Sequence, residues 1–178
     1  MQGMEELTKT SPEYNTLQSF IKPIFAEKEW QELKRKDGGG SIWLSLISPR
    51  RKNVPLFMTK AYRSKATVKD ATLYYIEAKK EYTKLPTVND AGCPNTSVLQ
   101  VWVTEDSLGR MNVKKAMVDL TDCDWKTVED VRSFATIKID NREFIVSVKH
   151  GWEDENYVIY EISQAGFRQL LKTNAGGC

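Results

Sequence analysis

The run Val98 to Thr104 (VLQVWVT), the five residues Glu105 to Gly109 (EDSLG) and the run Met111 to Leu120 (MNVKKAMVDL) decide the fold. β-Branched and aromatic side chains fill the first run, and acidic, small and glycine residues make the short connection after it. Two such runs joined by a turn are typical of neighbouring antiparallel strands. We therefore predict a β-hairpin over residues 98–120.

The chain after this hairpin predicts one short helix and more strands. The predicted elements are a helix at Thr127–Arg132, capped by the residues of Asp122–Trp125, then strands at 135–140, 143–149 and 157–162, and a last segment at 164–172 that fits either a helix or an extended run.

The chain before the hairpin predicts three helices and two strands. Ser11-Pro12-Glu13 is a good helix start, and Pro23 should kink or end that helix. The other predicted elements are a second helix at 27–36, strands at 41–48 and 54–62, a helix at 67–82 in which TLYYI alone could be a strand, and a linker at 85–96.

Composition is that of a globular chain with a substantial core. Of 178 residues, 40% are hydrophobic and 28% charged, which is too apolar for a disordered chain. The length suits one medium domain or two small ones. No apolar run is long enough to cross a bilayer, and the polar, acidic start predicts no secretory signal. Three cysteines without close spacing and one histidine, His150, argue against a disulfide framework or a zinc site. We expect a cytoplasmic protein.

The sequence ends in Asn174-Ala175-Gly176-Gly177-Cys178. Glycines carry no side chain to bury, and they accept backbone angles that other residues avoid. A tail of this kind is slim and flexible, so it can thread a narrow groove. A frayed end that contains glycines by chance, or a tail appended for thiol labelling, would have the same sequence.

The second half resembles the ubiquitin-like modifiers, whose β-grasp fold runs hairpin, helix, further strands and then a Gly-Gly tail. The segment Val113 to Phe134 is similar in type to the second strand and helix start of ubiquitin. The resemblance implies an α+β fold with a β-grasp domain at 96–178, preceded by an α+β region at 1–95 that has a helical segment and a hairpin-helix unit. Thr67-Val68-Lys69-Asp70-Ala71 echoes Thr127-Val128-Glu129-Asp130-Val131, so a tandem modifier of the interferon-induced or bacterial antiphage type, active in antiviral defence, and an ordinary α+β domain both stay open.

This resemblance implies a protein that is conjugated to others and is not itself an enzyme. A protease would remove Cys178, and the exposed Gly177 carboxylate would be activated, with Gly176 and Ala175 lying in the enzyme channel. The implied partners are an activating enzyme, a conjugating enzyme, a deconjugating protease and a protein target, with no membrane. The modifier would bind no cofactor, because the activating enzyme uses the ATP and Mg²⁺ and supplies the nucleophile.

Two enzyme alternatives rest on individual residues. Glu77-Ala78-Lys79 fits half of the motif of Mg²⁺-dependent nucleases, and Asp70 is the nearest upstream aspartate, although it is too close for the usual spacing. A charged surface segment would give the same three letters. A thiol enzyme would need a histidine beside its cysteine, and Cys93 with His150 is the pair that the sequence offers for this. The distance between the two residues in the sequence does not match a known motif.

A nucleic-acid-binding module is a further alternative, and it rests on the basic first half. The near-balanced net charge of +2 argues against a strongly basic binder of nucleic acid. However, basic clusters with interleaved aromatic residues occur at 34–36, 50–52 and 60–69, and such clusters can form a surface for phosphates. Solvated turns and helix ends would give the same pattern.

Overall fold

The computed structural model describes residues 2–37, 47, 49, 51–65, 71–82, 95–121, 130–150, 155–163 and 166–174. These residues form two antiparallel sheets and a helix, α1 (Pro12–Asp37). The first sheet has the order β2 (Glu5–Glu6), β3 (Phe57–Lys65), β4 (Thr72–Tyr82), β5 (Asn95–Glu105), β6 (Met111–Thr121). The second has the order β1 (Gln2–Gly3), β7 (Asp130–Ile139), β8 (Arg142–His150), β9 (Glu155–Ser163), β10 (Gly166–Asn174).

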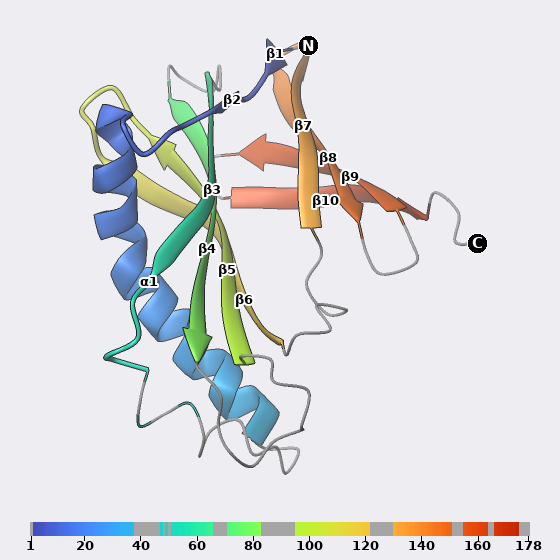
Figure 1. The fold of residues 1–178 in the computed structure, drawn as a ribbon. Helices are drawn as coiled ribbons and strands as arrows, with labels where there is room; N and C mark the ends of the chain where they lie inside the picture. The colour runs from blue at the N-terminus through green and yellow to red at the C-terminus, as the bar shows by residue number, and fades with distance from the viewer. Residues whose placement is uncertain are drawn as a thin grey trace.

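The elements stack in three layers. Helix α1 covers one face of the first sheet, and the second sheet covers the opposite face (Figure 1). Because side chains alternate between the two faces of a strand and both faces of the first sheet are covered, the central strand β4 is buried on both sides. Its Tyr74 and Ile76 belong to the core under α1, whereas Leu73 and Tyr75 belong to the core between the sheets.

Aromatic side chains dominate the core between the sheets. The ring centroid of Trp102 lies 4.8 Å from that of Tyr75 and 5.4 Å from that of Phe167. Tyr160 of β9 joins this cluster, with its ring centroid 6.0 Å from that of Phe167. Pairs at such separations add to the gain from burying apolar area, and this cluster holds the second sheet against the first.

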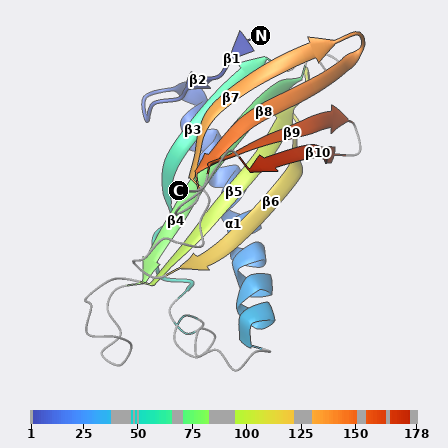
Figure 2. The same ribbon diagram turned by 90° about the vertical axis from the view of Figure 1, so that its right-hand side faces the viewer.

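The two sheets come close to each other at both edges. At one edge the N-terminal segment forms two short strands: β1 pairs with β7 through Gln2 and Gly3, and β2 pairs with β3 through Glu5 and Glu6. Figure 2 shows this short segment running from the second sheet to the first. At the other edge Gly166 opens β10 next to β6, where an added Cβ would meet the Lys114 carbonyl oxygen at 3.4 Å. Its φ of +134° is a conformation that favours glycine.

The α+β architecture with a C-terminal β-grasp domain is wrong. The described residues are mostly antiparallel strand, in two sheets, with one N-terminal helix. The predicted helix at 67–82 is strand β4 from Thr72 onward, because its apolar residues fit two buried sheet faces. At the predicted helix Thr127–Arg132, strand β7 already begins at Asp130. The two predicted N-terminal helices are one helix, which continues through Pro23.

Most of the predicted strands and the first helix start are confirmed. Helix α1 begins at Pro12, directly after Ser11. The confirmed strands are those predicted at 54–62, 98–104, 111–120, 135–140, 143–149 and 157–162, and the segment 164–172 takes its extended alternative as β10. The predicted domain boundary at residue 95 falls where β5 begins, and β5 pairs with β4 along its whole length. The strand predicted at 41–48 lies outside the described residues except for Ile47, which is helical and not extended. Most of the linker predicted at 85–96 also lies outside them, apart from the start of β5. Within the described chain, no helix combines the length and apolar character needed to cross a bilayer.

Candidate functional site

An open cleft of about 660 Å³ lies between α1 and the segment that leads into β3. Gln18, Ser19, Lys22 and Ala26 of α1 form one wall. Residues 51–56 form the other wall, and Lys80 of β4 also lines the cleft. The volume is in the range of sites that take small molecules or a short piece of a polymer.

Cationic side chains dominate the charge of this cleft. Lys22 and Lys52 are exposed, Arg51 is half-buried and Lys80 is buried. No carboxylate is among the described residues that line it. Cations that share a concave surface raise the local concentration of anions, so this arrangement favours an anionic ligand.

Lys80 is held from behind by Glu29 of α1, a carboxylate with 0% exposure. The Lys80 Nζ donates to Glu29 Oε2 at 3.0 Å and to the Arg51 carbonyl oxygen at 2.9 Å. The Tyr82 hydroxyl donates to the other carboxylate oxygen, Glu29 Oε1. An isolated buried charge would be very costly, and here each charged group has a partner of opposite charge and further hydrogen bonds.

Burial and the adjacent Glu29 carboxylate raise the pKa of the Tyr82 hydroxyl well above its usual range. Tyr82 therefore stays protonated at neutral pH and serves as a hydrogen-bond donor. This cluster can hold an anion near Lys80, whereas both oxygens of the Glu29 carboxylate already accept hydrogen bonds, from Lys80 and from Tyr82.

Arg51 is fixed against α1 by several contacts. Its guanidinium donates from Nη2 to the Ala26 carbonyl oxygen at 3.0 Å and lies over the Trp30 ring, 5.0 Å from the ring centroid. Its backbone N–H donates to the Ile47 carbonyl oxygen at 3.0 Å. The wall of the cleft therefore presents a cation of defined position instead of a freely rotating one.

Sequence reasoning identified the basic cluster at 50–52 but missed Glu29 and Lys80. A signal for Glu29 was present, because it continues the buried stripe of α1, four residues after Phe25 and four before Leu33. Lys80 shares its face of β4 with Ala78 and Tyr82, a pattern that becomes visible only once the segment is read as a strand.

The nuclease residues Glu77 and Lys79 lie on β4, facing away from α1. Glu77 accepts a hydrogen bond from the Thr59 hydroxyl at 2.9 Å and pairs with Lys60 at 3.5 Å, and Lys79 pairs with Glu81. Asp70 lies outside the described residues. In the part of the chain that the structure describes, no three His, Cys, Asp or Glu residues are grouped so that they could hold a metal ion.

The predicted conjugation residues Ala175, Gly176, Gly177 and Cys178 follow the last described residue, so nothing in the structure places them. Cys93 also lies outside the described residues. His150 ends β8, and its side chain is not described.

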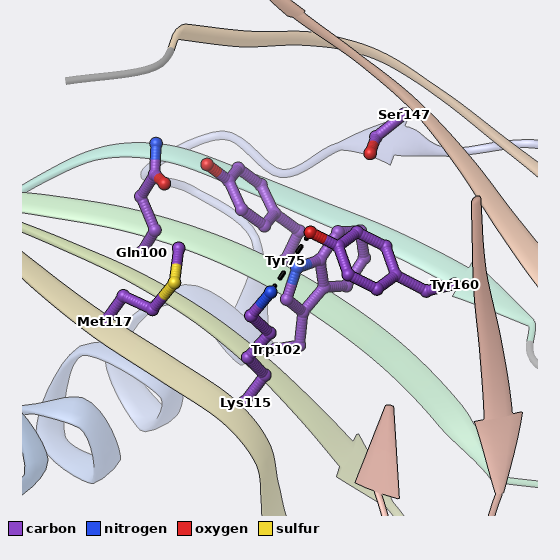
Figure 3. Close-up of a pocket in the computed structure, with 7 residues that line it drawn as sticks. All are labelled: Tyr75, Gln100, Trp102, Lys115, Met117, Ser147 and Tyr160. Atoms are coloured by element: carbon purple, nitrogen blue, oxygen red, sulfur yellow. Dashed lines mark hydrogen bonds between the residues drawn. The ribbon is translucent and has the colours of Figure 1, made fainter. Parts of the chain in front are cut away.

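A second pocket lies between the sheets and is much smaller. Tyr75, Gln100 and Trp102 of the first sheet face Ser147 and Tyr160 of the second (Figure 3). Lys115 closes it by donating to the Tyr160 hydroxyl at 3.0 Å (Figure 3). Its volume of about 10 Å³ is at the lower limit for one water molecule, so this space is an element of core packing and not a ligand site.

The cleft beside α1 is the larger of these two pockets and is the candidate site. Comparison with known proteins adds no analogy to it: no protein family, curated protein or solved structure matches the chain.

Proposed function

We propose that the protein binds nucleic acid, seating a single-stranded segment in the cleft beside α1, and that it does so without catalysis. One observation carries this proposal: Lys22, Arg51, Lys52 and Lys80 line the same concave surface, and the described part of its lining contains no carboxylate. Glu29, which does not line the cleft, neutralises the charge of Lys80. Lys22, Arg51 and Lys52 then give the cleft a local excess of positive charge.

The chain's small net charge of +2 does not conflict with this proposal, because binding depends on how charges are distributed. The cleft's size suits a few nucleotides of a single strand better than a duplex. Lysine and arginine contacts to phosphates release bound counterions, so binding should weaken steeply as salt is added.

A direct binding measurement tests the proposal. Fluorescence anisotropy with a 3′-labelled thymidine oligonucleotide should give saturable binding at low salt. The variant Lys22→Glu with Lys52→Glu should lose at least tenfold in affinity, and the slope of log K against log salt should fall by roughly 0.7 for each phosphate contact removed.

Lys138→Glu is the matched control, because Lys138 is an exposed lysine on β7, an element that does not line the cleft. It should leave the affinity within about twofold of wild type, since exposed charges more than a Debye length apart are largely screened at moderate salt. Equal losses in the cleft variant and in Lys138→Glu would contradict the proposal.

Conjugation through the C-terminal glycine is a second candidate, now without the β-grasp fold. The observation that favours it is exposure: Leu170 and Leu171 of β10, the strand that leads to the tail, are 43% and 46% exposed. If Gly177 is transferred, a source lysate with ATP and Mg²⁺ should convert the protein into higher-mass adducts. Deleting residues 175–178 should abolish them, and adducts that persist after the deletion would exclude transfer through the tail.

A further inference from the structure

Arg51 has hydrogen-bonding capacity that the described part of the chain does not use. A guanidinium carries five N–H donors, and in the described chain one acceptor, the Ala26 carbonyl oxygen, is found for them. The ring of Trp30 supports its position. A guanidinium that is already immobilised loses little entropy on binding, and its planar fork matches two oxygens of one anion.

Lys80 is held just as firmly, with one donor to spare. Two of its three N–H groups can be assigned to Glu29 Oε2 and the Arg51 carbonyl oxygen. No oxygen acceptor for the third is found among the described residues, and the ammonium lies 5.1 Å from the centroid of the Phe25 ring. With 8% exposure Lys80 is buried, yet it lines the cleft.

We propose that Arg51 and Lys80 form one fixed subsite for a single phosphate group of the bound strand. The Arg51 fork takes two phosphate oxygens, and the spare Lys80 donor takes a third. The oxygens of a phosphate lie at the corners of a tetrahedron, so the fork and the ammonium can each take separate oxygens, whereas a planar carboxylate with two oxygens would have to share one of them between the two cations. Lys22 and Lys52 attract the strand by their charge, whereas this subsite recognises phosphate. The inference rests on the proposed function, because it names the chemical group of the ligand that the same cleft binds.

Arg51→Lys tests the fork while keeping the charge. Loss of a bidentate, charge-assisted contact should weaken oligonucleotide binding by about tenfold. The salt slope should stay unchanged, because no positive charge is removed. The control is Arg168→Lys on β10, an exposed arginine paired with Glu161 on an element that does not line the cleft, and it should bind like wild type.

Glu29→Gln combined with Lys80→Gln tests the second half of the subsite. The double variant removes one positive and one negative charge, so a purely diffuse field predicts unchanged affinity. The subsite predicts a loss of about fivefold or more, since the spare ammonium donor is gone. Circular dichroism should be used to check that each variant is folded, and if the double variant does not fold, the result with Arg51→Lys decides whether the subsite exists.

Competition by small anions gives an independent readout. Inorganic phosphate should displace the oligonucleotide from wild type at a lower concentration than acetate of equal ionic strength, and Arg51→Lys should abolish that difference. If wild type binds but Arg51→Lys behaves like Arg168→Lys, the subsite is wrong and the proposed function stands. If wild type shows no salt-dependent binding, both are wrong.

Discussion

At the scale of single residues, the structure depends on a buried charge pair between a helix and a strand. Glu29 has no exposure, and Lys80 and Tyr82 satisfy its two oxygens. Removing one member of such a pair leaves the other as an uncompensated buried charge, which typically costs about 3–5 kcal/mol. Glu29→Gln and Lys80→Gln should each lower the free energy of unfolding by roughly that amount.

The double variant Glu29→Gln with Lys80→Gln should be more stable than the sum of the two single losses predicts, because it leaves no unpaired charge. Urea unfolding of the wild type, both single variants and the double variant, followed by circular dichroism, completes the thermodynamic cycle. Strictly additive losses would show that the two groups do not stabilise one another.

The residues of this pair were predictable to different degrees. Glu29 could have been singled out from the sequence, because a carboxylate interrupts an otherwise apolar helical stripe. The partner was not predictable, since 51 residues separate Glu29 from Lys80 and only the folded sheet brings them together. The basic cluster around Arg51 was identified, but its contact with Trp30 depends on tertiary structure in the same way.

At the scale of elements, Pro23 lies in the interior of α1 and does not end it. Proline lacks the N–H that would bond to the carbonyl of Ser19, and its ring crowds that carbonyl. The buried residues on either side, Ile21 and Phe25, keep the helix continuous because both pack against the first sheet. The sequence therefore correctly indicated that proline destabilises this part of the helix, but the free energy gained by packing Ile21 and Phe25 against the sheet is larger than that cost.

Pro23→Ala should therefore stabilise the protein. Restoring the hydrogen bond and removing the crowding is worth about 3 kcal/mol, less up to about 1 kcal/mol for the more flexible unfolded chain. We expect a net gain of about 2 kcal/mol in the free energy of unfolding, measured by urea titration. Asn15→Ala, at an exposed position nearer the helix start, controls for the general helix preference of alanine. An equal gain in both variants would argue against a specific cost at Pro23.

Strand segments were easier to predict than helices here, for a local reason. The runs 98–104 and 111–120 are rich in β-branched and apolar residues, and both are strands. The segment Thr72–Tyr82 fell within the helix predicted at 67–82, because Tyr75, Ala78 and Tyr82 also have helical spacing, although its TLYYI residues alone fitted a strand. Its position as the central strand, paired with both β3 and β5, decides the outcome, and no local pattern contains that information.

Glu161 of β9 ties three strands of the second sheet together. Arg142 of β8 donates to its Oε1 at 2.6 Å, and Arg168 of β10 donates to its Oε2. Hydrogen bonds from Arg142, the larger effect, and from Arg168 lower the pKa of the Glu161 carboxyl from its usual 4.5 to about 2. The contribution of this cluster to stability is thus present above pH 4.5 and is lost as the pH falls toward 2.

Arg168→Gln should raise the pKa of Glu161 toward its usual value, because one of the two cations is lost. A side-chain carboxyl NMR titration measures this shift directly. Stability should then decline less between pH 4.5 and 2 than in wild type. Lys138→Gln, which removes a cation elsewhere on the second sheet, should leave the Glu161 titration in place. An unchanged midpoint in Arg168→Gln would mean that the ion pair does not persist in solution.

At the scale of the whole molecule, the second sheet depends on the first for its buried face. Ile145, Val158 and Tyr160 meet Leu73, Tyr75 and Trp102 across the gap between the sheets. On the opposite face of the first sheet, α1 covers a separate core that includes Leu17, Ile21 and Phe25. The first sheet is thus the common support of both outer layers (Figure 1). The cleft is lined by α1, residues 51–56 and Lys80, on the helix side of that sheet.

Trp102→Ala should loosen the second sheet selectively. Trp102 is 6% exposed and contacts Tyr75 and Phe167, so its truncation should cost about 3–5 kcal/mol and should weaken the contact between the sheets. Hydrogen exchange should then show the amides of β8 and β9 losing protection before those of β4.

Phe25→Ala, which opens a hole under α1 instead, should destabilise the protein by a similar amount without this order of exchange. Because the cleft is built from α1, β4 and residues 51–56, Trp102→Ala should also retain oligonucleotide binding under conditions in which it is folded. Uniform loss of protection in Trp102→Ala would show instead that the three layers open as a single unit.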